Sequence, residues 1–240
     1  MAAIQHEEKF SPSDLINAFT DSLPAGNLFI PGFVNTLEDN ATIDMRTLKP
    51  ETGGLSKEAF IQYKKGNCVR TNDPFHSFFI FGKDGEKIVL STFDNIDTFG
   101  ENSVFGYLHN NCATLLIMDL SLYFGFTFAH YVEQQMKVSY RETQPFHFNF
   151  TNMEGQTSKK IFNIYAKKRG YIPKMNSLEG PLKDAGALEK IKFNDLDVFK
   201  IDLQKTYQVL KNDIENNKAR NLIDFKFSLY LKQTIKKITG

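Results

Sequence analysis

Apolar and polar positions along the chain change their spacing repeatedly, which predicts helices and strands that follow one another. From Ser11, the segment SPSDLINAF has a capping residue, a proline at the first helical position and Asp14 at the third, which is typical of a helix start. The apolar run NLFIPGF from Asn27 predicts a buried strand that ends at Pro31 and Gly32.

Two further segments predict a helix and a hairpin. LSKEAFIQYKK from Leu55 has helical spacing, and we expect Ser56 to cap this helix and Gly66 to stop it. HSFFIFG and KIVLSTF are typical of paired strands, because the pair Asp84-Gly85 between them is a strong hairpin signal.

The middle of the chain combines an apolar strand with a histidine. ATLLIMDL from Ala113 is nearly all apolar, the pattern of a central strand covered on both faces of its sheet. FTFAHYVEQ follows it, and Thr127 is placed to cap a helix there. His130 and Glu133 or Gln134 would then lie on the same side as Thr127. Ligands bind at the carboxyl ends of strands in open α/β sheets, so His130 is a candidate site residue.

The rest of the chain predicts one exposed-edge strand, PFHFNF from Pro145, and helices near the end. The helix that contains Leu203 to Ile214 extends in this interpretation to Ile223, and LKQTIKKITG predicts a solvated helix end. Together the elements predict an α/β fold with three layers, α/β/α, around a central mixed and largely parallel sheet. We expect a single domain over residues 1–240, with a core over 11–142 and a C-terminal extension over 143–240.

Composition and charge indicate an ordinary globular protein. The chain has 240 residues, 41% of them hydrophobic and 24% charged, as is ordinary for a globular protein. Its 29 Lys and Arg balance 28 Asp and Glu, so a nucleic-acid or membrane partner is not expected. Cys68 and Cys112 are the only cysteines, which fits a reducing, cytoplasmic location, and the five histidines show no metal-ligand spacing. The start of the chain has no pattern of a signal peptide.

Three motifs occur in order along the chain. RTNDPFHSFFIFG begins at Arg70, FGENSVFGYL begins at Phe99, and TFAHYVE runs from Thr127 to Glu133. The first resembles the Arg-Ser-x-His-Pro-x-His-Ser stretch of the aminoglycoside 3-N-acetyltransferase (antibiotic N-acetyltransferase) family, with Asp73 in place of the first His. The second is similar to that family's Phe-Gly-x-x-Ser-Pro element, with Val104 in place of Pro. The third resembles its Thr-x-x-His-x-x-Glu signature, and VSYRE after it also fits.

The resemblance implies an enzyme that moves an acetyl or similar acyl group from acetyl-CoA to the amino group of an aminoglycoside or amino sugar, without a metal. His130 would be the general base, because an ammonium must lose a proton before it attacks a thioester. Glu133 would hold the imidazole in one tautomer. Residues assigned to the cofactor are Arg70, His76, Ser77 and Thr127, and those assigned to the acceptor are Asp73, Asn102 and Ser103.

Five of these assignments have a purely structural alternative. His130 suits a buried core histidine, Glu133 a solvated acid on a helix face, and Thr127 a helix cap. Arg70 suits a pair with an internal carboxylate, and Asp73 a turn cap ahead of Pro74.

One departure from the family supports a second hypothesis. Members begin with an extra strand and helix before the equivalent of Asn27, and this chain starts at about the helix that should follow. A domain without them would lack part of the coenzyme A pocket; it would keep the fold, lose catalytic turnover and act as a binding or interaction protein. Under the enzyme hypothesis, a polycationic acceptor needs acids, and Glu38, Asp39 and Asp44 are candidates in the loop LEDNATID. The acceptor, acyl chain length and oligomeric state stay open; an oligomer is possible.

Overall fold

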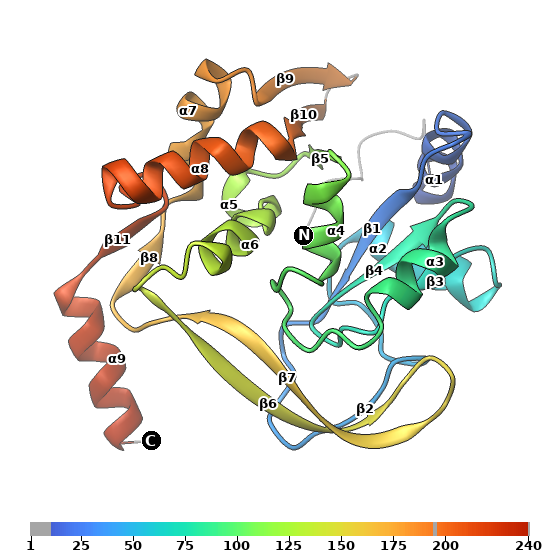
Figure 1. The fold of residues 1–240 in the computed structure, drawn as a ribbon, viewed down its shortest axis with the longest axis horizontal. Helices are drawn as coiled ribbons and strands as arrows, with labels where there is room; N and C mark the ends of the chain where they lie inside the picture. Colours follow the sequence, from blue (N-terminus) through green and yellow to red (C-terminus); the bar gives the residue numbers. More distant parts are fainter. Residues whose placement is uncertain (1–10, 194–195, 240) are drawn as a thin grey trace. The chain divides into compact units, whose positions relative to one another are not determined.

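The structure is a computed structural model that describes residues 11–193 and 196–239 (Figure 1). Its chain divides into two compact units. Unit 1 contains Met1–Thr98, Asn102–Val104 and Pro145–Ile164; unit 2 contains Phe99–Glu101, Phe105–Gln144 and Tyr165–Gly240. Each unit takes residues from both the predicted core and the predicted C-terminal extension. That the chain forms a single domain stays a prediction.

The elements in chain order are α1 (Pro12–Asp21), β1 (Leu28–Phe33), β2 (Thr42–Asp44), α2 (Gly54–Lys64), β3 (Val69–Arg70), β4 (His76–Phe81), α3 (Gly85–Ser91), α4 (Val104–Asn110), β5 (Thr114–Met118), α5 (Leu122–Gly125), α6 (Phe128–Gln135), β6 (Arg141–Thr151), β7 (Thr157–Lys167), β8 (Tyr171–Pro173), the 3-10 turn η1 (Met175–Leu178), α7 (Glu179–Asp184), β9 (Leu188–Phe193), β10 (Leu196–Asp202), α8 (Leu203–Asn217), β11 (Ile223–Phe225) and α9 (Phe227–Thr239). None of the helices in the described part of the chain is both long and apolar enough to cross a membrane.

The predicted start of α1 is confirmed. The Ser11 side chain accepts a hydrogen bond from the Asp14 backbone N–H at 3.2 Å, and the Asp14 carboxylate accepts one from the Ser11 backbone N–H at 3.0 Å. This reciprocal pair satisfies two backbone donors that the first helical turn leaves open. Helix α1 then buries Ile16.

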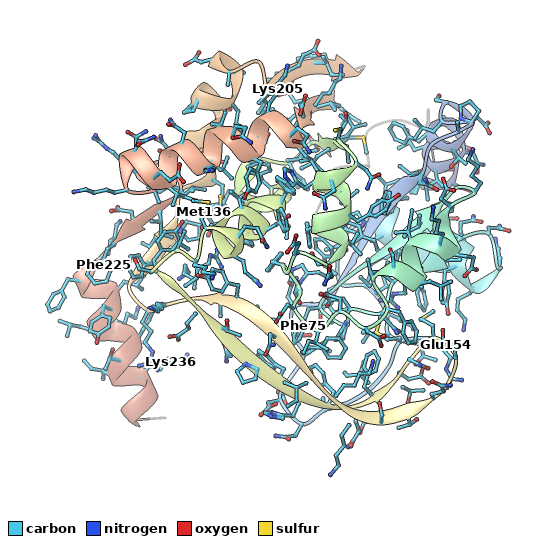
Figure 2. The ribbon with its side chains drawn as sticks, viewed as in Figure 1. Phe75, Met136, Glu154, Lys205, Phe225 and Lys236 are labelled. Carbon is cyan, nitrogen blue, oxygen red and sulfur yellow. The ribbon has the colours of Figure 1, made fainter. Side chains whose placement is uncertain are left out.

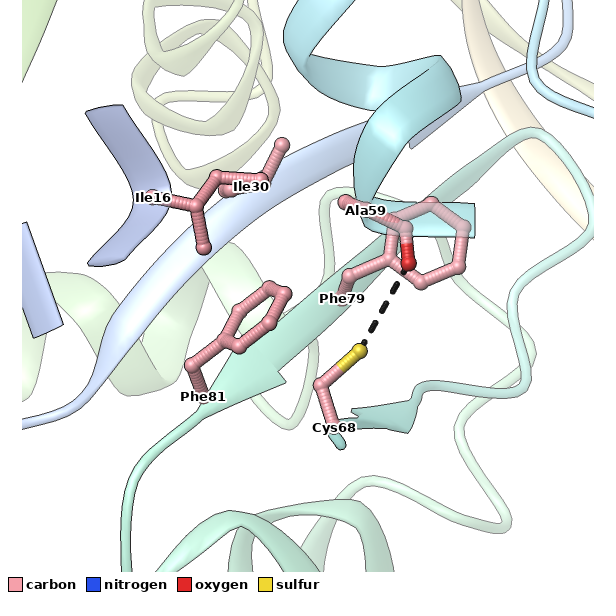
Figure 3. Packing of buried hydrophobic residues seen from close by; sticks show 6 residues of the cluster. All are labelled: Ile16, Ile30, Ala59, Cys68, Phe79 and Phe81. Carbon is pink, nitrogen blue, oxygen red and sulfur yellow. Dashed lines mark hydrogen bonds between the residues drawn. The ribbon is translucent and has the colours of Figure 1, made fainter. Parts of the chain in front are cut away.

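The first sheet of unit 1 has the strand order β1-β4-β3, with both pairings antiparallel. Its core cluster contains apolar side chains from α1, α2 and the sheet, and Figure 3 shows their packing. The cluster consists of Ile16, Ile30, Ala59, Cys68, Phe79 and Phe81. The Cys68 thiol lies 3.6 Å from the Ala59 carbonyl oxygen, and burial raises the pKa of this thiol to about 12.

Two details of this region differ from the sequence predictions, and a third is confirmed. β1 continues through Pro31 and Gly32 to Phe33. Among the described strands it lies at the edge of its sheet, where the missing backbone N–H of a proline is tolerated. Helix α2 begins before Ser56, whose hydroxyl instead accepts a hydrogen bond from Thr52 at 2.8 Å. Its stop at Gly66 is confirmed, since this glycine has a positive φ of 80°.

The predicted hairpin around Asp84-Gly85 is wrong. β4 already pairs with β1 on one edge and β3 on the other, so it has no edge left for a third strand. The segment KIVLS forms helix α3 instead, which buries Ile88 and Val89 and leaves Leu90 exposed. A short continuous apolar run such as Ile88 to Leu90 fits a strand covered on both faces as well as one turn of a helix, so the pattern alone does not decide between them.

Another sheet has the order β2-β6-β7, and β2 pairs with β6 in parallel. β2 belongs to unit 1, as do β6 from Pro145 onward and β7 up to Ile164, while the first residues of β6 and the last of β7 belong to unit 2. The predicted alternation in PFHFNF is confirmed, because Phe148 and Phe150 are buried while His147 and Asn149 are exposed. The predicted edge position is wrong, since β6 is the middle strand. Phe75, labelled in Figure 2, joins a core cluster with Ile43, Met45, Phe148, Phe150 and Phe162.

Unit 2 contains the sheet β5-β10-β9 and the pair β11-β8, all antiparallel. The apolar segment ATLLIMDL forms β5 as predicted, but β5 is an edge strand of its sheet and Leu116 is exposed. The prediction of a central strand covered on both faces is therefore wrong for the described residues.

The α/β class is confirmed, whereas the single, largely parallel sheet is not. The described strands form four small sheets, in which β2 and β6 are parallel and the pairs β1–β4, β3–β4, β5–β10, β9–β10 and β8–β11 are antiparallel. The short connection between β9 and β10 explains why this pair is antiparallel, because β9 ends at Phe193 and β10 begins at Leu196. Two residues are too few for the crossover that parallel strands need. The absence of the family's first strand and helix stays a prediction.

The last helices of unit 2 follow the predicted periodicity, with one boundary corrected. α8 buries Leu203 and Leu210 as expected. It ends at Asn217, because Lys218 adopts a left-handed conformation with φ 55°, and Ile223 belongs to β11 rather than to the helix. The predicted C-terminal helix is α9, which leaves Phe227 and Ile235 exposed.

Candidate active site

His130 lies in α6 of unit 2, shortly after β5 and α5. The end of α5 packs closely against β5 at Gly125. A Cβ atom at this position would lie only 2.5 Å from the Ile117 side chain of β5, so only glycine fits without a shift. α6 buries Phe128, Ala129 and Val132. The His130 side chain is 26% exposed, so its ring is anchored in the unit and also reaches the surface.

The predicted contact between His130 and Glu133 is confirmed. The His130 Nδ1 lies 2.8 Å from the Glu133 Oε2, one helical turn away. The Phe99 ring lies edge-on to the imidazole, with the ring centroids 5.5 Å apart. These two neighbours fix the ring plane and leave Nε2 as the nitrogen that the carboxylate does not contact.

Glu133 is not a solvated acid, because its side chain is 0% exposed. Its Oε1 accepts a hydrogen bond from the Tyr140 hydroxyl at 3.0 Å, and its Oε2 lies 2.6 Å from the Arg141 Nε. Burial alone would raise the pKa of the Glu133 carboxyl, but the contacts with His130, Arg141 and Tyr140 outweigh it and lower this pKa. Glu133 is therefore a buried, ionised carboxylate.

Arg141 completes this set; it lies in the segment VSYRE, but the sequence analysis assigns it no role. Its side chain is 6% exposed, its Nη2 lies 2.8 Å from the His130 Nδ1, and its Nη1 donates to the Tyr165 carbonyl oxygen at 2.9 Å. Burial and then the Arg141 charge lower the pKa of His130, and the Glu133 contact only partly opposes them. The His130 ring is thus held neutral near pH 7.

Thr127 occupies the position just before α6, and its carbonyl oxygen accepts a hydrogen bond from the His130 N–H at 3.0 Å. Its side chain makes no capping hydrogen bond within the described structure, and its backbone is helical, with φ −62° and ψ −25°. The prediction that the Thr127 side chain caps the helix is therefore wrong. Its contact with a cofactor stays a prediction.

Arg70 and Ser77 form a buried network in unit 1. The Arg70 Nε and Nη2 both donate to the Ser77 Oγ at 3.0 Å. Ser77 Oγ in turn donates to the Gly32 carbonyl oxygen at 2.9 Å. Gly32 permits this approach, because a Cβ there would lie 2.9 Å from Ser77 Oγ.

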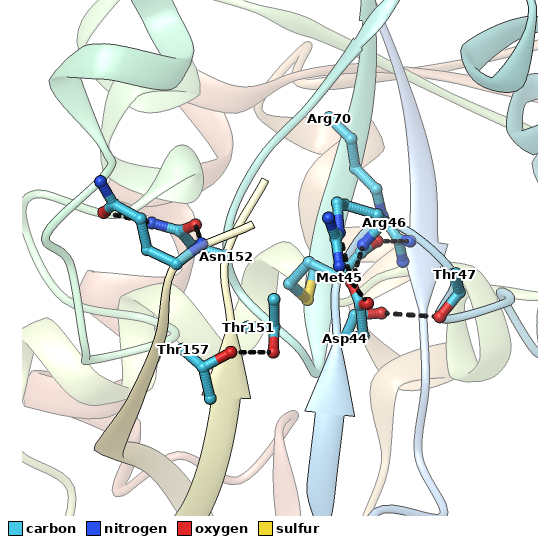
Figure 4. Close-up of polar contacts among 9 residues, drawn as sticks. Asp44, Met45, Arg46, Thr47, Arg70, Thr151, Asn152 and Thr157 are labelled. Atoms are coloured by element: carbon cyan, nitrogen blue, oxygen red, sulfur yellow. Dashed lines mark hydrogen bonds and ion pairs between the residues drawn. The ribbon is translucent and has the colours of Figure 1, made fainter. Parts of the chain in front are cut away.

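The remaining Arg70 donors reach backbone carbonyl oxygens of Met45, Leu48 and Gly32, and Figure 4 shows Arg70 beside Met45. The internal carboxylate predicted as a partner of Arg70 is thus replaced by neutral groups of the protein, whereas a contact with a phosphate stays a prediction. Burial lowers the pKa of Arg70 to about 10. Since its donors and the Ser77 hydroxyl are used internally, we assign these two residues a structural role; their contact with a cofactor stays a prediction.

Asp73 and His76 lie next to this network. The Asp73 Oδ1 accepts hydrogen bonds from the backbone N–H groups of Phe75 at 2.8 Å and His76 at 2.9 Å. The predicted turn cap around Pro74 is therefore confirmed, and it occupies one of the two carboxylate oxygens. The His76 ring is partly exposed at the start of β4 and lies 4.7 Å from the Phe33 ring, centroid to centroid.

The predicted acceptor residues Asn102 and Ser103 belong to unit 1 and come just before the start of α4. Asn102 is exposed in a turn, whereas Ser103 is buried. The predicted site residues thus fall into two groups: Thr127, His130 and Glu133 in unit 2, and Arg70, Asp73, His76, Ser77, Asn102 and Ser103 in unit 1. Among the residues that the structure describes, no cluster of three or more His, Cys, Asp or Glu side chains is suited to bind a metal ion.

Comparison with known proteins identifies the family. The family model described as aminoglycoside 3-N-acetyltransferase matches residues 1–215, which is most of the chain. The chain belongs to the aminoglycoside 3-N-acetyltransferase family. No curated protein matches the chain.

Solved structures of this family have a similar fold. The aminoglycoside acetyltransferase AAC(3)-IVa apoenzyme is 18% identical, with a TM-score of 0.64 over 88% of this chain and 78% of its own. AAC-IIIb in a binary complex with CoASH is 14% identical, with a TM-score of 0.68 over 85% and 83%. AAC-VIa with bound sisomicin is 14% identical, with a TM-score of 0.69 over 86% and 85%. At these identities the likeness establishes the fold alone.

Proposed function

We propose that this protein transfers an acetyl group from acetyl-CoA to an amino group of an aminoglycoside or a related amino sugar, with His130 as the general base. The observation that carries the proposal is the partly exposed imidazole, whose Nδ1 lies 2.8 Å from the buried carboxylate of Glu133. Family membership and the fold shared with CoA-bound and sisomicin-bound acetyltransferases support it.

The chemistry follows from the roles of the two ring nitrogens. When Nδ1 carries its proton and donates it to Glu133, Nε2 has a free lone pair. Nε2 then takes a proton from the acceptor ammonium, and the free amine attacks the thioester carbonyl. The C–N bond forms and the C–S bond breaks. The nitrogen then loses a second proton, which leaves on the thiol of CoA, and His130 releases its own proton to water. The lowered pKa of His130 keeps this lone pair available near neutral pH.

The remaining site assignments belong to the same proposal. His76 and Thr127 are assigned to the cofactor. Asp73, Asn102 and Ser103 are assigned to the acceptor. The acids in and before β2 are candidates to bind a cationic acceptor. Glu38 is exposed, and Asp39 is 48% exposed but lies 3.1 Å from the His147 Nδ1. Asp44, the last residue of β2, already pairs with Arg46 at 2.7 Å.

Thiol release from acetyl-CoA tests this function. The purified chain is mixed with acetyl-CoA and sisomicin, gentamicin, apramycin or glucosamine, and the free thiol is measured over time against a sample without acceptor. We expect release that depends on one of these amines. Calorimetric titration with CoA is the companion measurement, because CoA binding without release for any amine would favour the binding-protein hypothesis. No CoA binding at millimolar concentration would overturn the proposal.

A further inference from the structure

Arg141 is the charged residue closest to the proposed base apart from Glu133, and none of the predicted roles includes it. It is the first residue of β6, and its buried guanidinium contacts three groups of unit 2. These are the Glu133 Oε2 at 2.6 Å, the His130 Nδ1 at 2.8 Å and the Tyr165 carbonyl oxygen at 2.9 Å. A side chain held at three points in this way has a fixed position relative to the imidazole.

The charges in this group balance only while the ring is neutral. The Glu133 side chain is 0% exposed and that of Arg141 is 6% exposed, so their charges compensate each other with little help from water. A protonated His130 would add a second positive charge 2.8 Å from the guanidinium. Opposite charge close to an ionisable group favours its charged form, and like charge disfavours it.

The His130 Nδ1 has two neighbours with opposite hydrogen-bonding roles. The Glu133 Oε2 can only accept a hydrogen bond, and the Arg141 Nη2 can only donate one, yet both lie 2.8 Å from the same nitrogen. A neutral ring satisfies one of them in either tautomer. An imidazolium satisfies the carboxylate alone and adds repulsion toward Arg141, so the geometry disfavours the charged ring.

We propose that Arg141 is a positioning residue that keeps the His130 imidazole neutral, and therefore able to accept a proton, by balancing the Glu133 charge and opposing a charge on the ring. Its importance for catalysis rests on the proposed function. The protonation of His130, in contrast, is a property of the protein without substrate.

The other groups around His130 show which charges besides that of Arg141 act on its protonation. From α6 there is Glu133, and the Phe99 ring packs on the imidazole without charge. The titratable or charged groups contributed by the segment before β6, by β6 and by β7 are Tyr140, Arg141, Tyr165 and Lys167. Burial raises the pKa of Tyr140, so its hydroxyl stays neutral, and burial followed by the Arg141 charge lowers the pKa of Lys167. Arg141 is the one permanent cation in this set that touches the ring.

NMR titration of the histidine rings tests the proposal. The five histidines are labelled with ¹⁵N, the His130 signal is assigned by its loss in His130→Asn, and its pKa is measured in the wild type and in Arg141→Gln. We expect the pKa of His130 to rise by about one unit or more when the guanidinium is removed. Arg141→Lys, which keeps the charge, should restore most of the wild-type value. Arg220→Gln, at an exposed arginine of the same unit, is the matched control and should leave the pKa unchanged.

An unchanged or lower pKa of His130 in Arg141→Gln would overturn the proposal. If Arg141→Gln does not fold, the pKa of His130 is instead compared between Glu133→Gln and the double variant Glu133→Gln/Arg141→Gln. In the double variant, removal of the guanidinium leaves no unpaired carboxylate. We expect the pKa of His130 to rise from the single to the double variant in the same way. If the enzyme is active, the acidic limb of the kcat/KM profile should move upward with the pKa. A pKa rise in a protein without acetyl transfer would refute the proposed function and leave this inference standing.

Discussion

The substitution Glu133→Gln removes the negative charge of the buried group and keeps its size. In the native protein this carboxylate is fully buried and lies 2.6 Å from the Arg141 guanidinium, which is itself 6% exposed. After the change, Arg141 is a buried cation whose charge nothing in contact compensates. Breaking a buried ion pair by removal of one partner costs about 3–5 kcal/mol. For a chain of this size each kcal/mol lowers the Tm by roughly 2–4 °C, so we expect a fall of about 10 °C.

The assay is chemical and thermal unfolding, with Glu142→Gln as the control. Glu142 is the neighbouring acid on the exposed side of β6, and a change there should cost less than about 0.5 kcal/mol. The folded-state pKa of Glu133 is lowered, so its stabilising effect is present above the unfolded pKa of about 4.3 and is lost as pH falls further. The difference between wild type and Glu133→Gln should therefore shrink in acid. A loss no larger than that of the control would refute the described charge balance.

Three other predictions follow from single side chains. Arg70→Met should cost about 3–5 kcal/mol in chemical unfolding, because several buried carbonyl oxygens and the Ser77 hydroxyl lose their donor; an effect below about 1 kcal/mol would contradict the structural role. His76→Ala should weaken CoA binding about tenfold in calorimetry while the relative rates for different acceptors stay the same. An unchanged Kd would remove His76 from the cofactor assignment. With a disulfide reagent at pH 8, exposed Cys112 should react fast and buried Cys68 only after denaturation, and equal rates in the native protein would contradict the packing of Cys68.

Local signals in the sequence predicted part of this structure. The capping box at Ser11 and Asp14 and the spacing of His130 and Glu133 concern residues three positions apart, so helix geometry alone places them. The alternation in β6 likewise needs only the period of a strand.

Pairing partners and long-range contacts could not be predicted in the same way. α3 was interpreted as a strand because nothing local reveals that both edges of β4 are already occupied. Arg141 lies 11 residues from His130, and their contact depends on how the start of β6 packs against α6. Arg70 was expected to meet a charged group, but it meets carbonyl oxygens from segments as far as 38 residues away. A single side chain carries no signal for such partners.

The central claim is that His130 removes the proton from the attacking amine. It is tested most directly by the rate of amine-dependent thiol release from acetyl-CoA by the wild type and by His130→Asn, at saturating acetyl-CoA and acceptor, with thermal unfolding measured on both. We expect kcat to fall by a factor of about 10²–10⁴, the usual contribution of a general base, while the Tm changes by only a few degrees. A His130→Asn protein that keeps its fold and turns over within threefold of the wild type would contradict the account.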